Sequence, residues 1–349
     1  MFQVFAATPE DMGPGEIGAH AARAEAIGFD GLQVPDALHD GLLLAALALN
    51  ATNKLLVGTG VLLAFPRSPM TVAIASWDLQ KMSGGRFELG LGTQIKQNIE
   101  QRYSARWGSP VPQLREYVQS LKAIFHSFQT GEKLCFEGEH YQFTRLQPFF
   151  NPGPIDHPDI PILCGAVGPD MTRMVARIAD GMITHPTNTA PEYIRDVCLP
   201  RLQEGFDKAQ RSSECFKLLL GPLTATGCDE ASVAKQWEKQ RQLLGFLYST
   251  PAYWPSLELF GWQDKGGQLL DMARSGSWQD MPSIVTDEML EKFVPRGTYD
   301  QIGAIYRERY TGLTRRITFP MPTNPAHDLA ATKAITDLKT GSRVSKALD

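Results

Sequence analysis

The chain has 349 residues, of which 43% are hydrophobic, which is enough for one large domain or two small ones. Its net charge of -4 and its pI near 6.0 give no sign of a nucleic-acid-binding surface. No apolar run reaches the roughly 18 residues that a membrane span needs, and the opening MFQVFAATPEDMG lacks the basic region of a signal peptide, so we expect a cytoplasmic protein.

Cysteine and histidine spacing argues against a disulfide framework and against a metal centre. The five cysteines are odd in number and form no CxxC pair, which favours reduced thiols. The seven histidines are equally scattered, and no HExxH motif is present. We therefore expect no metal site.

Short apolar runs alternate with amphipathic stretches along the whole chain. In the first unit, apolar residues recur at helical spacing from Ile17 to Ile27 and stop at Gly28, as in a helix that ends in glycine. In the third unit, Pro69 fits the first position of a helix, where its missing N–H costs nothing. The apolar runs cover residues 2–6, 31–35, 54–63, 86–92, 160–166, 181–185, 216–227 and 315–321. The expected helices cover residues 17–27, 41–52, 69–83, 111–128, 169–179, 191–209, 230–247 and 299–310.

These eight strand–helix units predict an α/β protein, a (β/α)8 TIM barrel with insertions. Strands that are apolar on both faces and alternate with helices are typical of a parallel sheet covered by helices. A doubly wound open sheet is the alternative. The predicted insertions are a small hairpin near 134–143 and a helical segment near 250–295. We expect one domain over 1–325 and a C-terminal helix or tail over 326–349.

Polar residues follow the second predicted strand, where a barrel would place its chemistry, since active sites lie at the carboxyl ends of barrel strands. Asp36 either caps the next helix or makes a turn, or else Asp36 or His39 faces a bound ring. A histidine at this edge is a candidate proton carrier because its ordinary pKa lies near neutrality.

The third predicted strand contains Gly58-Thr59-Gly60-Val61, which fits neither a Walker A loop nor a dinucleotide-binding fingerprint. One interpretation is a simple bulge in a barrel strand. The other is a close approach of the backbone to a flat ligand. After the fourth strand, the small residue Gly92 would point into the barrel or toward the same ligand.

A glycine-containing turn, Gly165-Ala166-Val167-Gly168, leads from the fifth predicted strand directly into a helix. Free N–H groups converge at such a helix start, and the helix dipole adds partial positive charge there, so the turn predicts a phosphate site. An ordinary strand-to-helix loop is the alternative. After the sixth strand, His185 is a second polar candidate at the rim.

Several segments together resemble the bacterial luciferase-like superfamily. They are AEAIGFDGLQVPD, LLVGTGVLLAFPRSPM, CGAVGPDMTRMVARIADGMI and VPRGTYDQIGAIYRERY, and their order and spacing match over residues 1–322. Within the superfamily, GTQIKQNIEQRYSARW, FEGEHYQFTRLQPFFNPGP and STPAYWPSLELFGW are similar to a subgroup of oxidoreductases that use a deazaflavin, coenzyme F420.

The resemblance implies a TIM barrel that binds coenzyme F420 or FMN without a covalent bond. It implies a cis peptide at Gly60-Val61 behind the ring, with Thr59 and Gly92 among the cofactor-binding residues. Asp36 matches the rim aspartate of the family. Residues 165–168 match its phosphate site.

Two departures from the family pattern concern catalysis. Relatives that oxidise sugar phosphates have a histidine directly after the rim aspartate, where this chain has Ala37. They also have an acid in the loop after strand four, where Gln94 and Ile95 stand here. We therefore do not carry over that mechanism or that substrate, and His39 and His185 are the candidate catalytic residues.

The sequence thus predicts an oxidoreductase that transfers a hydride between deazaflavin F420 and a small organic substrate. One alternative is an FMN-dependent monooxygenase that uses reduced flavin and O2, and another is a flavin-binding homologue without turnover. The resemblance also implies a homodimer. Neither nucleic acid nor a membrane is an expected partner.

Overall fold

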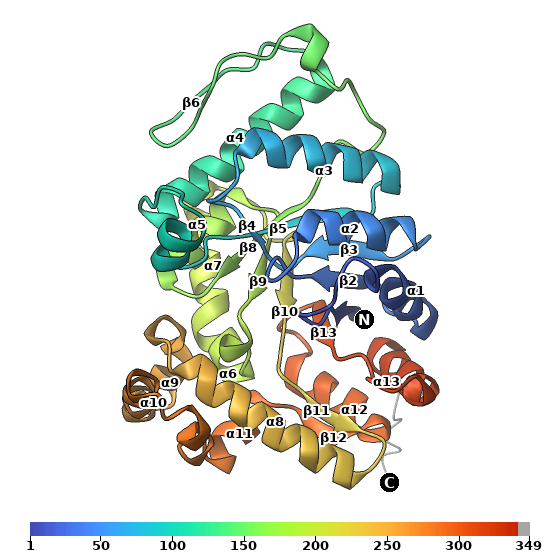
Figure 1. Cartoon of the computed structure of the whole chain (residues 1–349), viewed down its shortest axis with the longest axis vertical. Helices are drawn as coiled ribbons and strands as arrows, with labels where there is room; N and C mark the ends of the chain where they lie inside the picture. The colour runs from blue at the N-terminus through green and yellow to red at the C-terminus, as the bar shows by residue number, and fades with distance from the viewer. Residues whose placement is uncertain (341–349) are drawn as a thin grey trace.

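The computed structural model describes residues 1–340, and the end of the expected tail, 341–349, lies outside the described residues. Eight parallel strands form a closed ring, because β3 pairs with β5 as well as with β2 (Figure 1). The predicted (β/α)8 barrel is therefore confirmed. The ring strands are β1 (Gln3–Ala7), β2 (Gly31–Val34), β3 (Leu56–Thr59), β5 (Phe87–Gly92), β8 (Ile162–Ala166), β9 (Gly181–Thr184), β10 (Lys217–Leu220) and β13 (Arg316–Phe319).

Helices cover the outside of the ring and begin and end where the sequence places capping residues. Gly28 ends the first helix with φ 100°, and Ser68 caps the third, accepting a hydrogen bond from the Met70 N–H. The helices are α1 (Ile17–Ile27), α2 (Gly41–Asn50), α3 (Pro69–Ser83), α4 (Pro110–Thr130), α5 (Pro169–Ile178), α6 (Pro191–Tyr193), α7 (Leu199–Ala209), α8 (Glu230–Tyr248), α9 (Pro255–Leu259), α10 (Gln263–Ser275), α11 (Asp287–Phe293), α12 (Tyr299–Tyr310) and α13 (Asp328–Thr340). A π-helical turn, Ile194–Cys198, joins α6 to α7.

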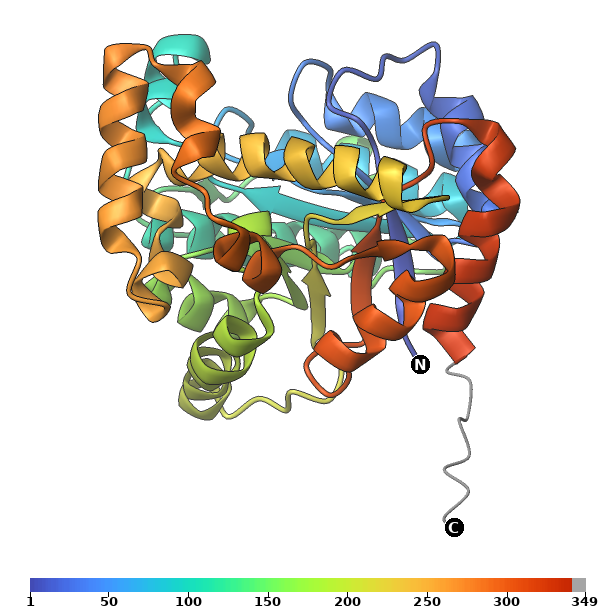
Figure 2. The same cartoon turned by 90° about the horizontal axis from the view of Figure 1, so that it is seen from below.

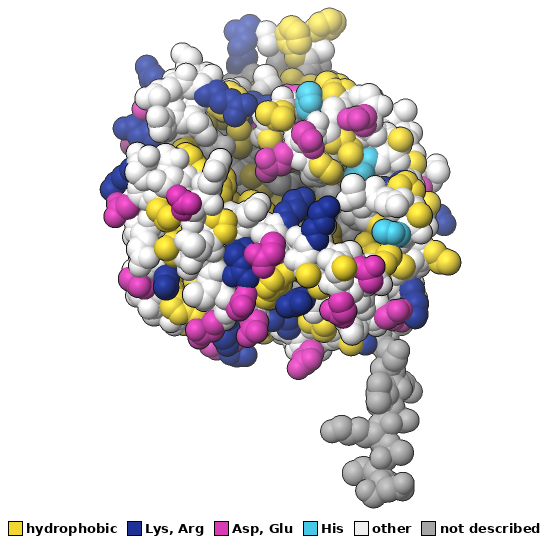
Figure 3. Space-filling view, turned by 60° about the horizontal axis from the view of Figure 1, so that its bottom comes forward, with side chains coloured by type: hydrophobic (Ala, Val, Ile, Leu, Met, Phe, Trp, Pro, Cys, Tyr) yellow, Lys and Arg dark blue, Asp and Glu magenta, His cyan; other side chains and the backbone are white. Residues whose placement is uncertain are grey.

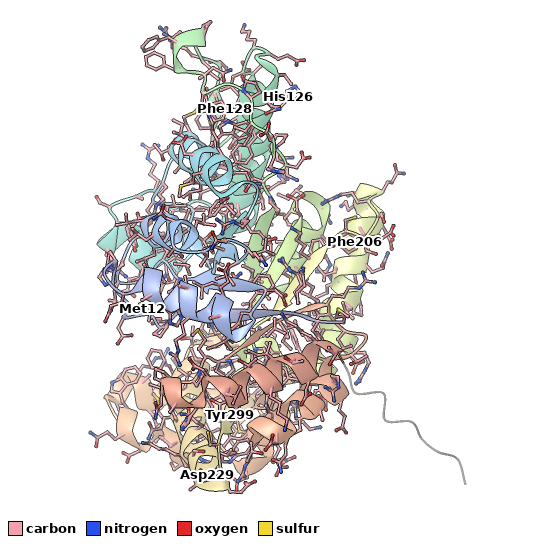
Figure 4. All side chains as sticks on the ribbon, turned by 90° about the vertical axis from the view of Figure 1, so that its right-hand side faces the viewer. Met12, His126, Phe128, Phe206, Asp229 and Tyr299 are labelled. Carbon is pink, nitrogen blue, oxygen red and sulfur yellow. The ribbon has the colours of Figure 1, made fainter. Side chains whose placement is uncertain are left out.

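Both predicted insertions are present, at opposite ends of the molecule. A small antiparallel hairpin, β6 (Phe136–Glu137) and β7 (Gln142–Phe143), follows α4. The short helices between 250 and 295 pack beside α8. Figure 4 labels His126 and Phe128 of α4 at the end of the molecule that lies away from Asp229, which caps α8, and from Tyr299, which begins α12.

The seventh apolar run, 216–227, is not one barrel strand as we expected. Only β10 joins the ring. After Pro222 the chain leaves the barrel, and β11 (Ala225–Gly227) pairs in parallel with β12 (Arg296–Thr298) outside it. The two outer strands pair the segment just before α8 with the segment just after α11.

Glycines in the barrel strands make room for larger neighbouring side chains, at the amino end of β2 and in the second half of β3. A Cβ atom added at Gly31 would lie 2.2 Å from the ring of Phe5, and one added at Gly58 would lie 2.8 Å from the carboxamide of Gln33. A few larger side chains therefore fill the space that the glycines leave. In Figure 2, β1 rises from the N-terminus, so the carboxyl ends of the strands point upward in that view.

Charged side chains close the opposite, amino-terminal end of the barrel. Glu88 accepts hydrogen bonds from both Arg316 (2.9 and 3.1 Å) and Lys217 (2.8 Å). The guanidinium of Arg316 also donates to the Gln3 side chain and lies 4.4 Å above the ring centre of Phe5. The floor of the barrel is thus polar, although the sequence runs looked apolar on both faces.

Candidate functional site

Residues at the carboxyl ends of the ring strands form a mouth that is open to solvent. Residues on alternate positions of each strand face the interior, and residues within one or two positions of the strand ends keep part of their surface exposed. Figure 3 shows a hollow near the middle of the visible face, with Lys and Arg side chains at its edge. Partly exposed residues with titratable side chains stand at this edge of the barrel at Asp36, His39 and His185. The mouth residues are Ala7, Gly60, Val61, Gly165, Ile183, His185, Gly221 and Thr318.

The third strand is interrupted at the mouth by a cis peptide between Gly60 and Val61, as the family resemblance implies. Beyond it, β4 (Leu62–Leu63) resumes the pairing with β5. The Val61 side chain lies across the ends of the next two strands: a Cβ atom would be only 2.4 Å from Val61 Cγ2 at Gly92 and 3.5 Å from Cγ1 at Gly165. Val61 and these glycines therefore make an apolar ledge at one side of the mouth.

Thr59 holds the strand together where the bulge interrupts its ladder. Its hydroxyl donates to the Gly90 carbonyl (2.7 Å) and accepts from the Gly90 N–H (2.9 Å). The side chain is fully buried. Thr59 thus supports the ledge from within the barrel wall and does not reach the mouth.

Asp36 holds the same region from the second strand. Its carboxylate accepts hydrogen bonds from the Gly41 and Leu63 N–H groups, and it forms a bidentate ion pair with Arg67, at 2.8 and 3.1 Å. Only 6% of the side chain is exposed. The structure therefore gives Asp36 both a turn-making role and an internal cation partner.

The predicted phosphate loop ends the fifth strand beside the ledge. Gly165, Val167 and Gly168 are partly exposed, whereas Ala166 is buried. The first intrahelical hydrogen bond runs from Thr172 N–H to the Gly168 carbonyl, so the amides before Thr172 precede the ladder of α5. A Cβ atom added at Gly168 would meet nothing within 4 Å.

His185 lies at the end of β9, and its ring is held on one edge and one face. Nδ1 is 2.7 Å from the Thr187 hydroxyl and accepts the Thr187 backbone N–H at 3.4 Å. The ring stacks on Tyr253, with centroids 3.8 Å apart and planes 10° apart. Burial lowers the pKa of His185 to about 4, so the ring is neutral at neutral pH.

The structure does not bring the two candidate catalytic histidines together. The His39 ring lies against the loop after β1, where a Cβ atom added at Gly13 would be 3.6 Å from His39 Nε2. The strands that precede the two histidines, β2 and β9, are four places apart in the eight-membered ring. His39 and His185 therefore stand on opposite sides of the mouth.

Comparison with known proteins agrees with this architecture. The family model described as "Luciferase-like monooxygenase" matches residues 1–316. The chain belongs to this family. An uncharacterized protein of Mycobacterium tuberculosis is 39% identical over 297 residues, which cover 85% of this chain and 87% of that protein.

Other luciferase-like relatives are named for an activity. The 5,10-methylenetetrahydromethanopterin reductase of Archaeoglobus fulgidus is 27% identical, with 84% of this chain and 85% of the relative covered. The F420-dependent glucose-6-phosphate dehydrogenase of Nakamurella multipartita is 35% identical over 59% of this chain and 62% of its own length.

Solved structures share the luciferase-like fold. The F420-dependent tetrahydromethanopterin reductase of Methanopyrus kandleri gives a TM-score of 0.77 at 21% identity, with 95% of this chain and 96% of that chain covered. The EDTA monooxygenase of Chelativorans sp. gives 0.72 at 12% identity, with 97% and 93% covered. At these identities the likeness concerns the fold alone.

Sequence reasoning missed three contributors to the mouth of this luciferase-like protein. Thr187 follows the sixth predicted strand and Tyr253 lies in the predicted segment near 250–295, and nothing in the spacing indicated that they hold His185. Arg67 pairs with Asp36 across 31 positions of sequence, which no local pattern reveals. One signal was available: Tyr253 lies in an aromatic-rich segment that could wall a pocket or cover the barrel.

Two other features of this family member lie away from the mouth. A pocket of about 840 Å³ lies at the amino-terminal end of the barrel, and Gln3, Lys217 and Arg316 are among its lining residues. Glu116 and the hairpin residues Glu139 and His140 bring possible metal ligands within 4.8 Å of one another. The Glu116 carboxylate already accepts the His140 backbone N–H there, at 2.7 Å.

In the described residues, no helix is both long and apolar enough for a membrane span.

Proposed function

We propose that the protein is an oxidoreductase that transfers a hydride between deazaflavin F420 and a small organic substrate. The observation that carries this proposal is the ledge at Gly60-Val61, which rises beside a glycine-lined mouth and adjoins a loop with free backbone amides. A flat ring fits against such a ledge, and a phosphate fits such a loop. Oxidoreductase chemistry itself is typical of the family.

The loop at 165–168 supports phosphate binding by its backbone, since no lysine follows it. The amides of Gly168 and of the first turn of α5 would donate hydrogen bonds, and the helix dipole would add attraction for an anion. Asp170 stands in that first turn, but its side chain is 83% exposed and lies 3.4 Å from Arg173. Its charge is therefore partly balanced and directed toward solvent.

Relatives favour F420 over FMN as the cofactor. Relatives named as F420-dependent enzymes are 26% to 35% identical to this chain. Solved structures named as monooxygenases are 11% to 16% identical to this chain, and at that identity they support the fold alone. The FMN-dependent monooxygenase is the second candidate because the matching family model is described as a luciferase-like monooxygenase.

In this proposal the residues of the chain bind, orient and exclude water. The bound deazaflavin would supply the hydride chemistry. Val61 and Gly92 would back the ring, while Thr59 and Asp36 act through the backbone that they hold. His185 and Tyr253 would face the substrate from across the mouth.

A binding experiment separates the two cofactors. Purified protein would be titrated with F420 and with FMN, and binding would be followed by the fluorescence of each molecule. We expect F420 to bind and to be preferred, whereas tight FMN binding with no F420 binding would overturn the proposal. Turnover of bound reduced F420 with organic acceptors would then exclude a homologue without catalysis.

Replacing Gly168 tests the phosphate loop separately. Gly168→Leu should weaken F420 binding at least about tenfold, since the new side chain would cover the amides that donate to the phosphate; about 1.4 kcal/mol corresponds to that factor. The variant should fold normally, because a Cβ atom there meets open space. An unchanged affinity together with an unchanged melting temperature would remove the loop from the site.

The implied homodimer and the role of His39 remain predictions. The mass of the protein in solution would test the first. For the second, His39→Ala should lower turnover more than F420 affinity if His39 carries a proton during the reaction.

A further inference from the structure

We propose that His185 acts as a neutral hydrogen-bond donor through Nε2, that Thr187 positions it, and that the substrate is a carbonyl compound whose oxygen accepts this bond. The inference rests on the proposed hydride transfer and specifies its substrate class. It assigns a role to Thr187, which the sequence did not single out as a site residue.

The position of the proton on His185 follows from its neighbours. A backbone N–H can only donate, and the Thr187 N–H is directed at Nδ1. The Thr187 hydroxyl, 2.7 Å from the same nitrogen, can then donate as well. With Nδ1 accepting, a neutral imidazole must carry its proton on Nε2.

Thr187 is itself fixed in place. Its side chain is fully buried, and its carbonyl accepts the hydroxyl of Tyr248 at 2.9 Å. Tyr248 is also fully buried. Thr187 therefore cannot move away from His185 without breaking a buried hydrogen bond, which makes the tautomer a built feature of the site.

The other edge of the ring is free to meet a ligand. Nε2 makes no hydrogen bond within residues 1–340, and it does not belong to the buried polar atoms that lack a partner, so solvent reaches it. Tyr253 stacks on the ring and restrains its plane. The result is an N–H group of fixed direction at the mouth.

Such a donor suits a carbonyl oxygen better than an anionic group. The eight mouth residues named above include no lysine or arginine, and the partly exposed Arg67 is already paired with Asp36 and Asp40. A neutral imidazole can polarise a carbonyl without giving up its proton. It cannot serve as a base in this tautomer, because its only free nitrogen already bears hydrogen.

The step balances for reduction of the carbonyl. A hydride from the reduced deazaflavin forms the new C–H bond, and the C=O π pair moves onto oxygen. The carbon is reduced by two electrons, and the deazaflavin is oxidised by two. The resulting alkoxide is held by Nε2–H and takes its proton from water that reaches the mouth.

Nitrogen NMR of the ring tests the tautomer without cofactor or substrate. In protein labelled with ¹⁵N-histidine, the signals that disappear in His185→Gln identify His185. We expect an unprotonated Nδ1 and a protonated Nε2, with the same pattern in Thr187→Ser. Thr187→Val keeps only the longer backbone N–H contact to Nδ1, at 3.4 Å, so we expect the share of the Nδ1-protonated form to rise in that variant. A protonated Nδ1 in the wild type would overturn the inference.

Turnover tests the role of the donor. A glutamine side chain can place an N–H near the position of Nε2, whereas leucine cannot. We expect His185→Leu to lower kcat for carbonyl reduction by about 10²-fold or more. We expect His185→Gln to keep most of the rate that His185→Leu loses. Equal loss in both variants would instead require proton transfer from the imidazole and would overturn the neutral-donor role.

Failure of this inference is distinguishable from failure of the proposed function. F420 binding in both His185 variants should match the wild type, since the phosphate loop and the ledge are intact. If F420 does not bind the wild type, the proposed function fails, whatever the NMR shows. If F420 binds and the enzyme reduces no neutral ketone or aldehyde but turns over a sugar phosphate, the substrate class is wrong.

Discussion

Single side chains at the mouth owe their behaviour to burial and to fixed neighbours. His185 shows this most directly, because its ring stacks on Tyr253 and its Nδ1 faces Thr187. Burial removes the water that would stabilise the charged ring. A proton on Nδ1 would also face the Thr187 N–H, so two donors would meet. A residue that would titrate near neutrality on the surface is thereby kept neutral.

The neutral His185 makes stability depend on pH. Its pKa is about 4 in the folded chain and near 6.5 when unfolded, so the unfolded state binds more protons between these values. The contribution of the neutral ring is fully present above about pH 6.5 and is lost as the pH falls toward 4. Chemical unfolding across this window should show a steeper loss for the wild type than for His185→Gln. Parallel curves for the two proteins would contradict the assigned pKa.

The candidate site could be predicted from sequence only where local chemistry marks it. Gly60-Val61 and the loop at Gly168 stand beside recognisable strand ends, and the structure places both at the mouth. Asp36 was also found, but its partner Arg67 was not, since their contact depends on how two loops fold over each other. Long-range pairs of this kind leave no periodic trace in the sequence.

At the scale of elements, the bulge in the third strand is the feature that shapes the mouth. Gly58 pairs with Glu88, and Leu62 pairs with Leu91, so four steps along one strand match three along the other. One extra residue is therefore accommodated, and the Thr59 side chain replaces the missing ladder contacts through Gly90. The bulge raises Val61 over the neighbouring strand.

Gly90→Ala tests how tightly this bulge packs. The added Cβ atom would lie within van der Waals overlap of the Thr59 carbonyl, at 1.9 Å, and a backbone atom cannot swing aside. We expect a loss of about 1–3 kcal/mol or more in the free energy of unfolding. Gly168→Ala, where the Cβ atom meets open space, is the matched control and should change it by less than about 0.5 kcal/mol. Equal stabilities would show that the two strands separate more easily than this packing implies.

Element boundaries were predictable where capping residues mark them and failed where the chain leaves the sheet. The helices that start at Pro69 and Pro169 begin as expected, because proline and the residue before it fix the first turn. The seventh apolar run was misread because its second half, Ala225–Gly227, is buried against other outer elements. Burial alone does not reveal which sheet a strand joins.

For the whole molecule, the charged floor links both ends of the chain. Gln3 and Arg316 lie at the starts of the first and last ring strands, and Glu88 joins them to Lys217 on a strand between. Glu88 is four residues before Gly92 along β5, or about 13 Å at roughly 3.3 Å per residue. The floor and the mouth therefore lie at opposite ends of the same strands, and stability and chemistry can be altered separately.

Glu88→Gln should reveal the weight of this floor in folding. Within residues 1–340, the change removes the only carboxylate paired with the buried guanidinium of Arg316, of which 5% of the side chain is exposed, and leaves two cations close together. Removing one partner of a buried ion pair typically costs about 3–5 kcal/mol, because the remaining charge loses its compensation. Glu204→Gln is the control: Glu204 pairs with Arg173 at the surface with 54% of its side chain exposed, and such pairs contribute about 0–1 kcal/mol. Denaturant unfolding of both variants at neutral pH measures the difference, and losses of similar size would mean that the floor is hydrated and does not act as a buried cluster. The NMR signals of His185 in folded Glu88→Gln complete the test. A large loss in the free energy of unfolding with an unchanged His185 tautomer would show that the floor stabilises the barrel without setting the geometry of the mouth.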